Sequence, residues 1–76
     1  MDITLDKLRP GQQVIVTDLG EDMYLKQRLM AYGMIPGTAV CCRYRTPDGS
    51  VTSLDCRGSV IALRTADMKR IWGRCQ

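Results

Sequence analysis

Histidine and phenylalanine are both absent from this chain of 76 residues. Without histidine, the chain lacks the commonest general base, the commonest metal ligand and the usual pH switch of proteins. The remaining residues contain no glycine-rich phosphate-binding loop, no carboxylate pair placed for acid–base chemistry and no serine with a base beside it. We therefore expect a protein that is not an enzyme and that carries no cofactor.

Long apolar runs are absent as well. No stretch approaches the ~20 apolar residues of a membrane-spanning helix, and charged residues begin at Asp2, where a secretory signal would be apolar. We expect a cytoplasmic protein without direct membrane insertion. The length predicts a single domain over residues 1–76, because a typical domain of ~100–200 residues leaves no room for a second.

A large excess of one charge sign is also lacking, since eleven basic and eight acidic residues give a net charge of +3. A nucleic-acid-binding domain usually has a denser basic face, with aromatic side chains between the charges. Tyr44 between Arg43 and Arg45 is the one candidate for such a site, and Tyr44 is expected to face the core. We expect no nucleic-acid partner, and an RNA-binding module stays as an alternative.

The four cysteines, Cys41, Cys42, Cys56 and Cys75, contain no pair with C-x-x-C spacing. Cys41 and Cys42 are adjacent in a predicted strand, so their side chains point to opposite faces. Reduced thiols, some of them buried as small apolar groups, are the expected state, and no metal is expected. The alternative is a metal-responsive domain with a zinc or iron site from Cys42, Cys56 and Cys75.

Two Pro-Gly dipeptides mark turns in the first half of the chain. Residues 9–12 and 35–38 place proline second and glycine third, which predicts type II turns. A strand is expected after each turn, over residues 12–19 and 38–45. The side chains expected to face the core from these strands are Val14, Val16, Val40, Cys42 and Tyr44.

Residues 22–32 are predicted to form a helix between these two strands. Asp22 suits the positive N-terminal end of a helix. Three apolar residues share one stripe that would face the sheet, namely Leu25, Leu29 and Tyr32. Gly33 is placed to end the helix in a Schellman motif, with Met34 as the hydrophobic residue after it.

Shorter elements are expected in the second half, separated by tight turns that contain glycine. Strands are predicted over residues 51–56 and 59–64. The second of these is apolar on both faces, which predicts the most buried strand. One helical turn with Thr65 as its cap and a last short strand beginning at Ile71 complete the pattern.

These elements predict a mainly β fold of about five short strands, with one helix inserted between the first two and a short helical turn near the C-terminus. Short strands protect their edges best by closing into a small barrel. We predict a small, partly open barrel of the SH3-like type. An OB-fold is the rival architecture, but its helix would lie between the third and fourth strands.

Met23 and Met30 lie seven residues apart and form a second stripe on the predicted helix. Two interpretations are open for them and for Met34. The methionines either complete the core under the helix, or they form an adaptable apolar surface on its outward face that docks a partner.

The order of motifs resembles the FeoA family, the small cytosolic proteins of bacterial ferrous iron uptake. The matching segments are Leu8-x-Pro10-Gly11, Gln27-Arg28-Leu29-x-x-Tyr32-Gly33-Met34-x-Pro36-Gly37-x-x-Val40, Gly58-x-x-Ile61-Ala62-Leu63-Arg64 and Ala66-x-x-x-x-Ile71. They cover nearly the whole chain, and the central stretch is the most specific. The resemblance implies an SH3-like barrel with a helical insertion.

The resemblance also implies a function and a partner. Members of this family are thought to act as accessory or regulatory proteins that dock on the cytosolic GTPase region of the membrane transporter FeoB. The residues expected to form that contact lie on the helix and the turn after it, namely Met23, Lys26, Gln27, Arg28, Met30 and Met34.

Two residues depart from the pattern of the family. Tyr32 stands where leucine is usual, so the helix is expected to present a larger contact. Gly73 stands where a branched apolar residue is usual, which is expected to weaken the terminal strand. Residues 74–76 are then expected to fray or to be recruited into a homo-oligomer.

Overall fold

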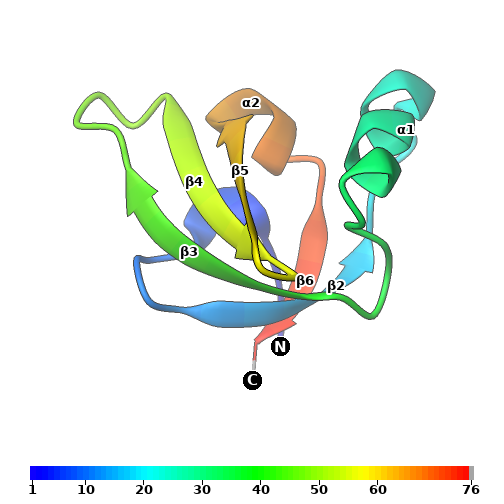
Figure 1. The fold of residues 1–76 in the computed structure, drawn as a ribbon, viewed down its shortest axis with the longest axis horizontal. Helices are drawn as coiled ribbons and strands as arrows, with labels where there is room; N and C mark the ends of the chain where they lie inside the picture. The colour runs from blue at the N-terminus through cyan, green and yellow to red at the C-terminus, as the bar shows by residue number, and fades with distance from the viewer. Residues whose placement is uncertain (76) are drawn as a thin grey trace.

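A single antiparallel sheet with the strand order β1-β6-β2-β3-β4-β5 forms the body of the protein in a computed structural model that describes residues 1–75 (Figure 1). Its elements in chain order are β1 (Asp2–Thr4), the 3-10 helix η1 (Leu5–Lys7), β2 (Gln13–Asp18), α1 (Met23–Ala31), β3 (Ala39–Arg45), β4 (Val51–Cys56), β5 (Ser59–Arg64), α2 (Thr65–Met68) and β6 (Trp72–Cys75). The mainly β fold with one inserted helix and a short C-terminal helical turn is confirmed.

The sheet has six strands where five were predicted. The strand missed was β1, whose three residues are too few to display an alternating pattern. It pairs with β6 through the register Ile3 opposite Gly73, and Ile3 packs against the core. The two ends of the described chain therefore lie side by side (Figure 1).

The core is aliphatic and lies on the concave side of the curled sheet. It is a cluster of buried hydrophobic side chains that contains no aromatic residue: Leu5, Leu8, Val14, Val16, Leu19, Leu25, Leu29, Met34, Val40, Cys42, Leu54, Cys56, Ile61, Leu63, Met68 and Ile71. Alternation along β2 predicted Val14 and Val16 correctly. The first half of β3 behaves in the same way, with Val40 and Cys42 buried.

Tyr44 does not face the core, and the prediction that it does is wrong. Cys42 pairs with Leu54, and Tyr44 pairs with Ser53, the neighbour of Leu54. Two steps along β3 thus match one step along β4, so Arg43 is an extra residue in the ladder. Such a β-bulge reverses the alternation beyond it. Tyr44 is consequently 59% exposed. Arg45 instead turns inward, where its guanidinium donates to the carbonyl oxygens of Asp6 and Leu8.

Strand β5 is not the most buried strand, although its sequence is apolar on both faces. Ile61 and Leu63 face the core, but Val60 is 59% exposed and Ala62 is also exposed. The reason is position: β5 is the last strand in the sheet order, so it has one free edge and an uncovered outer face. A continuous apolar run looks the same in a buried strand and in this edge strand.

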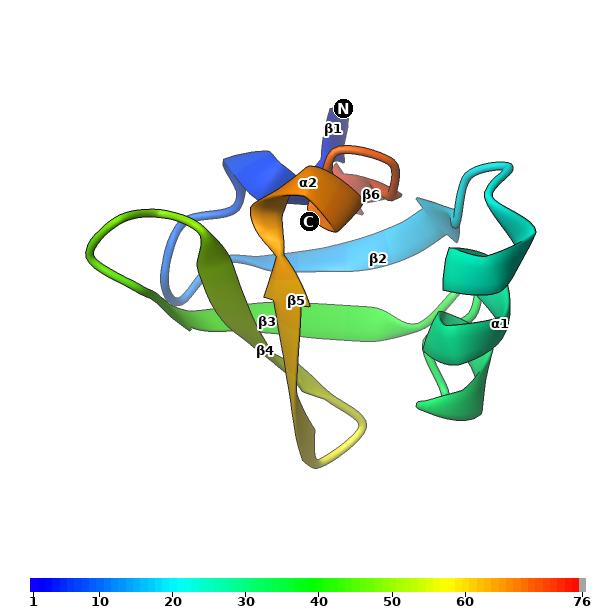
Figure 2. The same ribbon diagram turned by 90° about the horizontal axis from the view of Figure 1, so that it is seen from above.

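The open side of the sheet is bridged by short helical segments. Helix α2 contacts both β5 and η1, and its Met68 is buried (Figure 2). Thr65 is not the cap of α2, as predicted, but its first residue, because Arg64 occupies the cap position. The Thr65 hydroxyl instead donates to the carbonyl oxygen of Gly49 in the β3–β4 turn.

Strand β6 is an interior strand of the sheet and not a frayed end. It pairs with β1 on one side and with β2 on the other. A Cβ at Gly73 would lie 2.9 Å from Cγ2 of Val14 and 3.2 Å from Cδ2 of Leu5. Close packing therefore requires glycine at this position. The expectation that residues 74 and 75 fray is wrong, because both pair with neighbouring strands. Residue 76 lies outside the described residues.

We predict that Gly73→Ala destabilises the fold by about 1–3 kcal/mol, since overpacking a dense core costs that much. Urea unfolding followed by Trp72 fluorescence measures the change. The double variant with Val14→Ala should lose less stability than the sum of the two single variants, because Val14 supplies the clashing methyl group. Strict additivity of the two changes would contradict this packing explanation.

Candidate functional site

Helix α1 stands at one side of the barrel, beside the ends of β2 and β3 (Figures 1 and 2). Leu25 and Leu29 are the two residues of α1 that are buried. The expectation that Tyr32 completes this stripe is wrong, because Tyr32 caps the helix and is 48% exposed. The helix thus attaches to the core through a narrow stripe and leaves most of its surface open.

The N-terminal end of α1 is fixed by Asp22. One oxygen of its carboxylate accepts a hydrogen bond from the backbone N–H of Leu25 at 3.1 Å, which caps the helix. The other oxygen accepts from Nη1 of Arg70 at 2.7 Å, in the loop between α2 and β6. The Leu25 hydrogen bond lowers the pKa of Asp22, and the charge of Arg70 adds to this effect.

The C-terminal end of α1 is closed by the predicted Schellman motif. Gly33 has a φ of +87°, and its N–H donates to the carbonyl of Met30 at 3.0 Å. The N–H of Met34 donates to the carbonyl of Leu29, also at 3.0 Å. Met34 is fully buried as the hydrophobic residue of this motif. Its assignment to a partner-binding surface is therefore wrong.

The outward face of α1 brings together four of the predicted contact residues. Met23, Gln27 and Met30 follow one another at helical spacing along this face, with Lys26 at its flank. Met23 is 62% exposed and Met30 is 50% exposed, which are large values for apolar side chains. We call Met23, Lys26, Gln27 and Met30 the α1 face. Whether it binds a partner stays a prediction.

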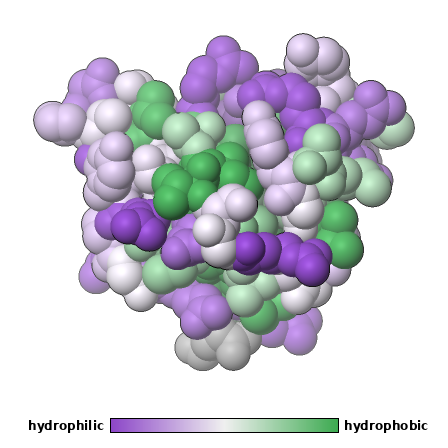
Figure 3. Space-filling model, viewed as in Figure 1, coloured by the Kyte–Doolittle hydropathy of each residue, from purple (hydrophilic) through white to green (hydrophobic). Residues whose placement is uncertain are grey.

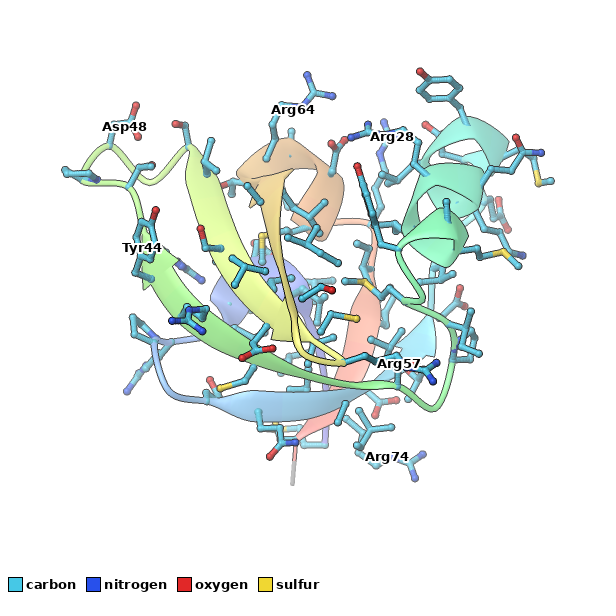
Figure 4. All side chains as sticks on the ribbon, viewed as in Figure 1. Arg28, Tyr44, Asp48, Arg57, Arg64 and Arg74 are labelled. Atoms are coloured by element: carbon cyan, nitrogen blue, oxygen red, sulfur yellow. The ribbon has the colours of Figure 1, made fainter. Side chains whose placement is uncertain are left out.

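Arg28 belongs to a different side of the helix. It is half-buried, and its side chain extends from α1 toward α2 and Arg64 (Figure 4). Tyr24, by contrast, is 74% exposed and was not among the predicted site residues. Tyr24 directly precedes the buried Leu25, and the helical angle between these neighbours is the one signal that could have placed Tyr24 outside the buried stripe.

The cysteines do not assemble the alternative metal site. Cys42 and Cys56 are buried in the aliphatic core, and this burial raises the pKa of both thiols. Cys75 is half-buried and accepts a weak hydrogen bond from Gln12 at 3.7 Å. No group of three His, Cys, Asp or Glu side chains among residues 1–75 is placed to hold a metal ion. The proposed combination of Cys42, Cys56 and Cys75 is therefore wrong.

The RNA-binding alternative gains no support from the geometry. Tyr44 is exposed, but Arg45 is turned inward to backbone carbonyls. Arg43 forms an ion pair with Asp55, whose oxygen lies 3.4 Å away. Both arginines beside Tyr44 therefore already have oxygen partners within the protein.

These features define a small SH3-like β-barrel with a helix inserted between β2 and β3, whose described helices are all too short to cross a membrane. The sequence model of the FeoA domain matches residues 3–75. The chain therefore belongs to the FeoA family, whose domain is associated with ferrous iron transport and is not known as an enzyme.

Solved structures support the fold assignment. The FeoA-like protein from Clostridium acetobutylicum is 23% identical, with a TM-score of 0.88 over 97% of this chain and 86% of that one. FeoA from Chlorobium tepidum is 22% identical, with a TM-score of 0.91 over 96% of this chain and 70% of that one. No curated protein sequence matches the chain.

The same fold occurs as part of a larger protein. A manganese-dependent transcriptional repressor in complex with manganese is 15% identical, with a TM-score of 0.91. The alignment covers 99% of this chain but only 37% of the repressor. The fold therefore occurs both as most of a chain and as one part of a longer one.

We predict that Asp22→Asn destabilises the protein at pH 7 and that the difference from the parent disappears in acid. Asparagine still caps a helix, so the change isolates the charge. Because folding lowers the pKa of Asp22 below its usual 3.8, its stabilisation is present above that pH and is lost as the pH falls through the folded-state value. Urea unfolding at a series of pH values from 7 downward measures this. The difference should shrink once the pH falls below 3.8, and a difference of constant size across the series would contradict it.

Proposed function

We propose that this protein is an accessory protein of bacterial ferrous iron uptake that docks, through the α1 face, on the cytosolic GTPase region of the FeoB transporter. Membership of the FeoA family supports the role in iron transport. The position of the contact on α1 rests on one observation, the exposure of Met23 and Met30 on a helix that the core holds by its other side.

The α1 face is not required by the packing of the barrel. Leu25 and Leu29 fill the space between the helix and the sheet, so Met23 and Met30 contribute little to the core. Methionine side chains are flexible and polarisable, and they adapt to the irregular surface of a partner. An apolar stripe kept on the outside of a small protein is a typical mark of an interaction surface.

The helix is also held rigidly enough to act as a preformed contact. Asp22 ties its first turn to Arg70, and the Schellman hydrogen bonds of Gly33 and Met34 fix the chain as it leaves the last turn. A partner then orders only the methionine, lysine and glutamine side chains on binding. Preorganisation of this kind lowers the entropic cost of association.

Isothermal titration of the protein against the isolated GTPase domain of its FeoB partner tests the proposal. We expect binding, with an affinity that differs between the GDP state and the state with a GTP analogue if the contact responds to the nucleotide switch. Met23→Asp with Met30→Asp should weaken binding at least ~10-fold, since it places two desolvated charges in an apolar contact.

The control variant is Tyr44→Asp, which changes another large exposed side chain on β3, away from α1. It should leave the affinity unchanged. The double methionine variant should keep the melting temperature of the parent within a few degrees, because both side chains lie outside the core. Full binding by that variant would contradict the assignment of the surface, and its unfolding would show that the methionines belong to the core.

A further inference from the structure

Strand β5 has a free hydrogen-bonding edge. It pairs with β4 on one side, and no strand among residues 1–75 pairs with it on the other. The two-residue turn Arg57-Gly58 closes on the pair Cys56 and Ser59, which fixes the alternation of the ladder. By that alternation, the N–H and C=O groups of Val60 and Ala62 point away from β4.

Proteins normally protect such an edge with lysine, proline, a bulge or a covering segment. None of these occurs within β5, and its register with β4 runs without a shift from Ser59 to Arg64. The side chains of Val60 and Ala62 are exposed on the outer face. An apolar patch accordingly occupies the centre of the surface in Figure 3, where β5 runs in Figure 1.

The free edge faces a groove. A hollow of about 370 Å³ separates β5 from the C-terminal end of α1. Its walls are Val60 and Ala62 on the strand side and Ala31 and Tyr32 on the helix side. The groove thus offers backbone hydrogen-bonding groups along one wall and an aromatic ring on the other.

Arginines lie at both ends of β5. Arg57 precedes the strand, and Arg28 and Arg64 lie near its far end (Figure 4). Arg64 is paired with Asp67 at 3.3 Å, whereas Arg28 and Arg57 form no ion pair with any of residues 1–75. Both are therefore available to a negatively charged ligand.

Arg57 also occupies an unfavourable backbone position. Its φ of +55° lies in the left-handed region, where glycine or asparagine would be less strained. It is the one residue other than glycine with a positive φ in the described chain. The requirements of a tight turn do not explain an arginine at this position. Its side chain passes close to Gly33, the residue that follows the Tyr32 wall of the groove.

We propose that an extended, acidic segment of another protein binds in this groove by adding as a strand to the free edge of β5. Its backbone would pair with Val60 and Ala62, its apolar side chains would contact the groove walls, and its carboxylates would lie near Arg57 and Arg28. This surface is distinct from the α1 face, so the inference does not rest on the function proposed above.

A second copy of this chain fits the edge less well than an acidic segment. Antiparallel pairing of two β5 strands would place Arg57 of one copy near Arg64 of the other. The like charges would repel each other at both ends of the paired strands. The charge of Arg57 therefore both attracts an acidic segment and discourages self-association through this edge.

The test uses a capped octapeptide of alternating valine and glutamate, and the matching peptide of alternating valine and lysine as control. Amide NMR spectra of the full chain are recorded during each titration. The glutamate peptide should shift the Val60 and Ala62 amides and slow their hydrogen exchange, and its affinity should fall as salt is added. The lysine peptide should cause neither change.

Variants of the chain separate strand addition from simple charge attraction. Ala62→Pro removes an N–H that faces the free edge, so it should abolish binding. The variant should still fold, because proline is tolerated on an edge strand. Ala62→Ser keeps the N–H and should keep the affinity. Arg57→Gly should weaken binding by about fivefold, the size expected for one partly exposed charge contact.

If Ala62→Pro does not fold, a glutamate peptide with N-methyl groups on alternate residues removes the reciprocal hydrogen bonds, which run from the N–H groups of the peptide to the carbonyl oxygens of Val60 and Ala62. It should fail to bind the parent chain. Equal binding of the two peptides, or shifts confined to Met23 and Met30, would overturn the proposal. Concentration-dependent shifts of the β5 amides without peptide would overturn it too, in favour of a second copy.

Discussion

The close contact between Gly73 and the side chains of Val14 and Leu5 is the constraint on which the rest of the structure depends. It lets β6 enter the sheet between β1 and β2, so that the two ends of the described chain hold the barrel together. A side chain at this point would push β6 away from the core. Without β6, the sheet would divide into a lone β1 and the block from β2 to β5.

Helix α1, in contrast to β6, is held in position by only a few contacts. The helix is fixed at its two ends, by the Asp22–Arg70 ion pair and by the Schellman hydrogen bonds, and by the short stripe of Leu25 and Leu29 between them. Little else of its surface is used by the fold. Where the core does not need a part of the helix surface, its side chains are free to suit a partner. The α1 face is such a surface.

The sequence predicted the elements that turn chemistry and strict alternation define. Strand β2, helix α1 with its Schellman ending, and the β3–β4–β5 hairpins were placed correctly, because proline and glycine mark their ends. The bulge at Arg43 could not be predicted, since an extra residue in a ladder depends on the partner strand. For the same reason, exposure of Val60 required knowing that β5 has no second neighbour.

The candidate site was predictable in part. Helical spacing correctly grouped Met23 and Met30 on one face, but it could not show that Arg28 turns toward α2. Met34 was assigned both to the Schellman motif and to the contact surface, and only the first assignment is compatible with its complete burial. The cysteine alternative was wrong because neighbouring strands place Cys42 and Cys56 in the core, where a thiol is merely a small apolar group.

The interior position of β6, between β1 and β2, has a consequence for how the protein is made. As the chain leaves the ribosome, β1 and β2 emerge early. The strand that pairs with both of them, β6, emerges last of the described elements. Long-range pairings of this kind form late and slowly. The barrel can close only after residues 72–75 have emerged, so folding is expected to be completed after synthesis of this domain and not during it.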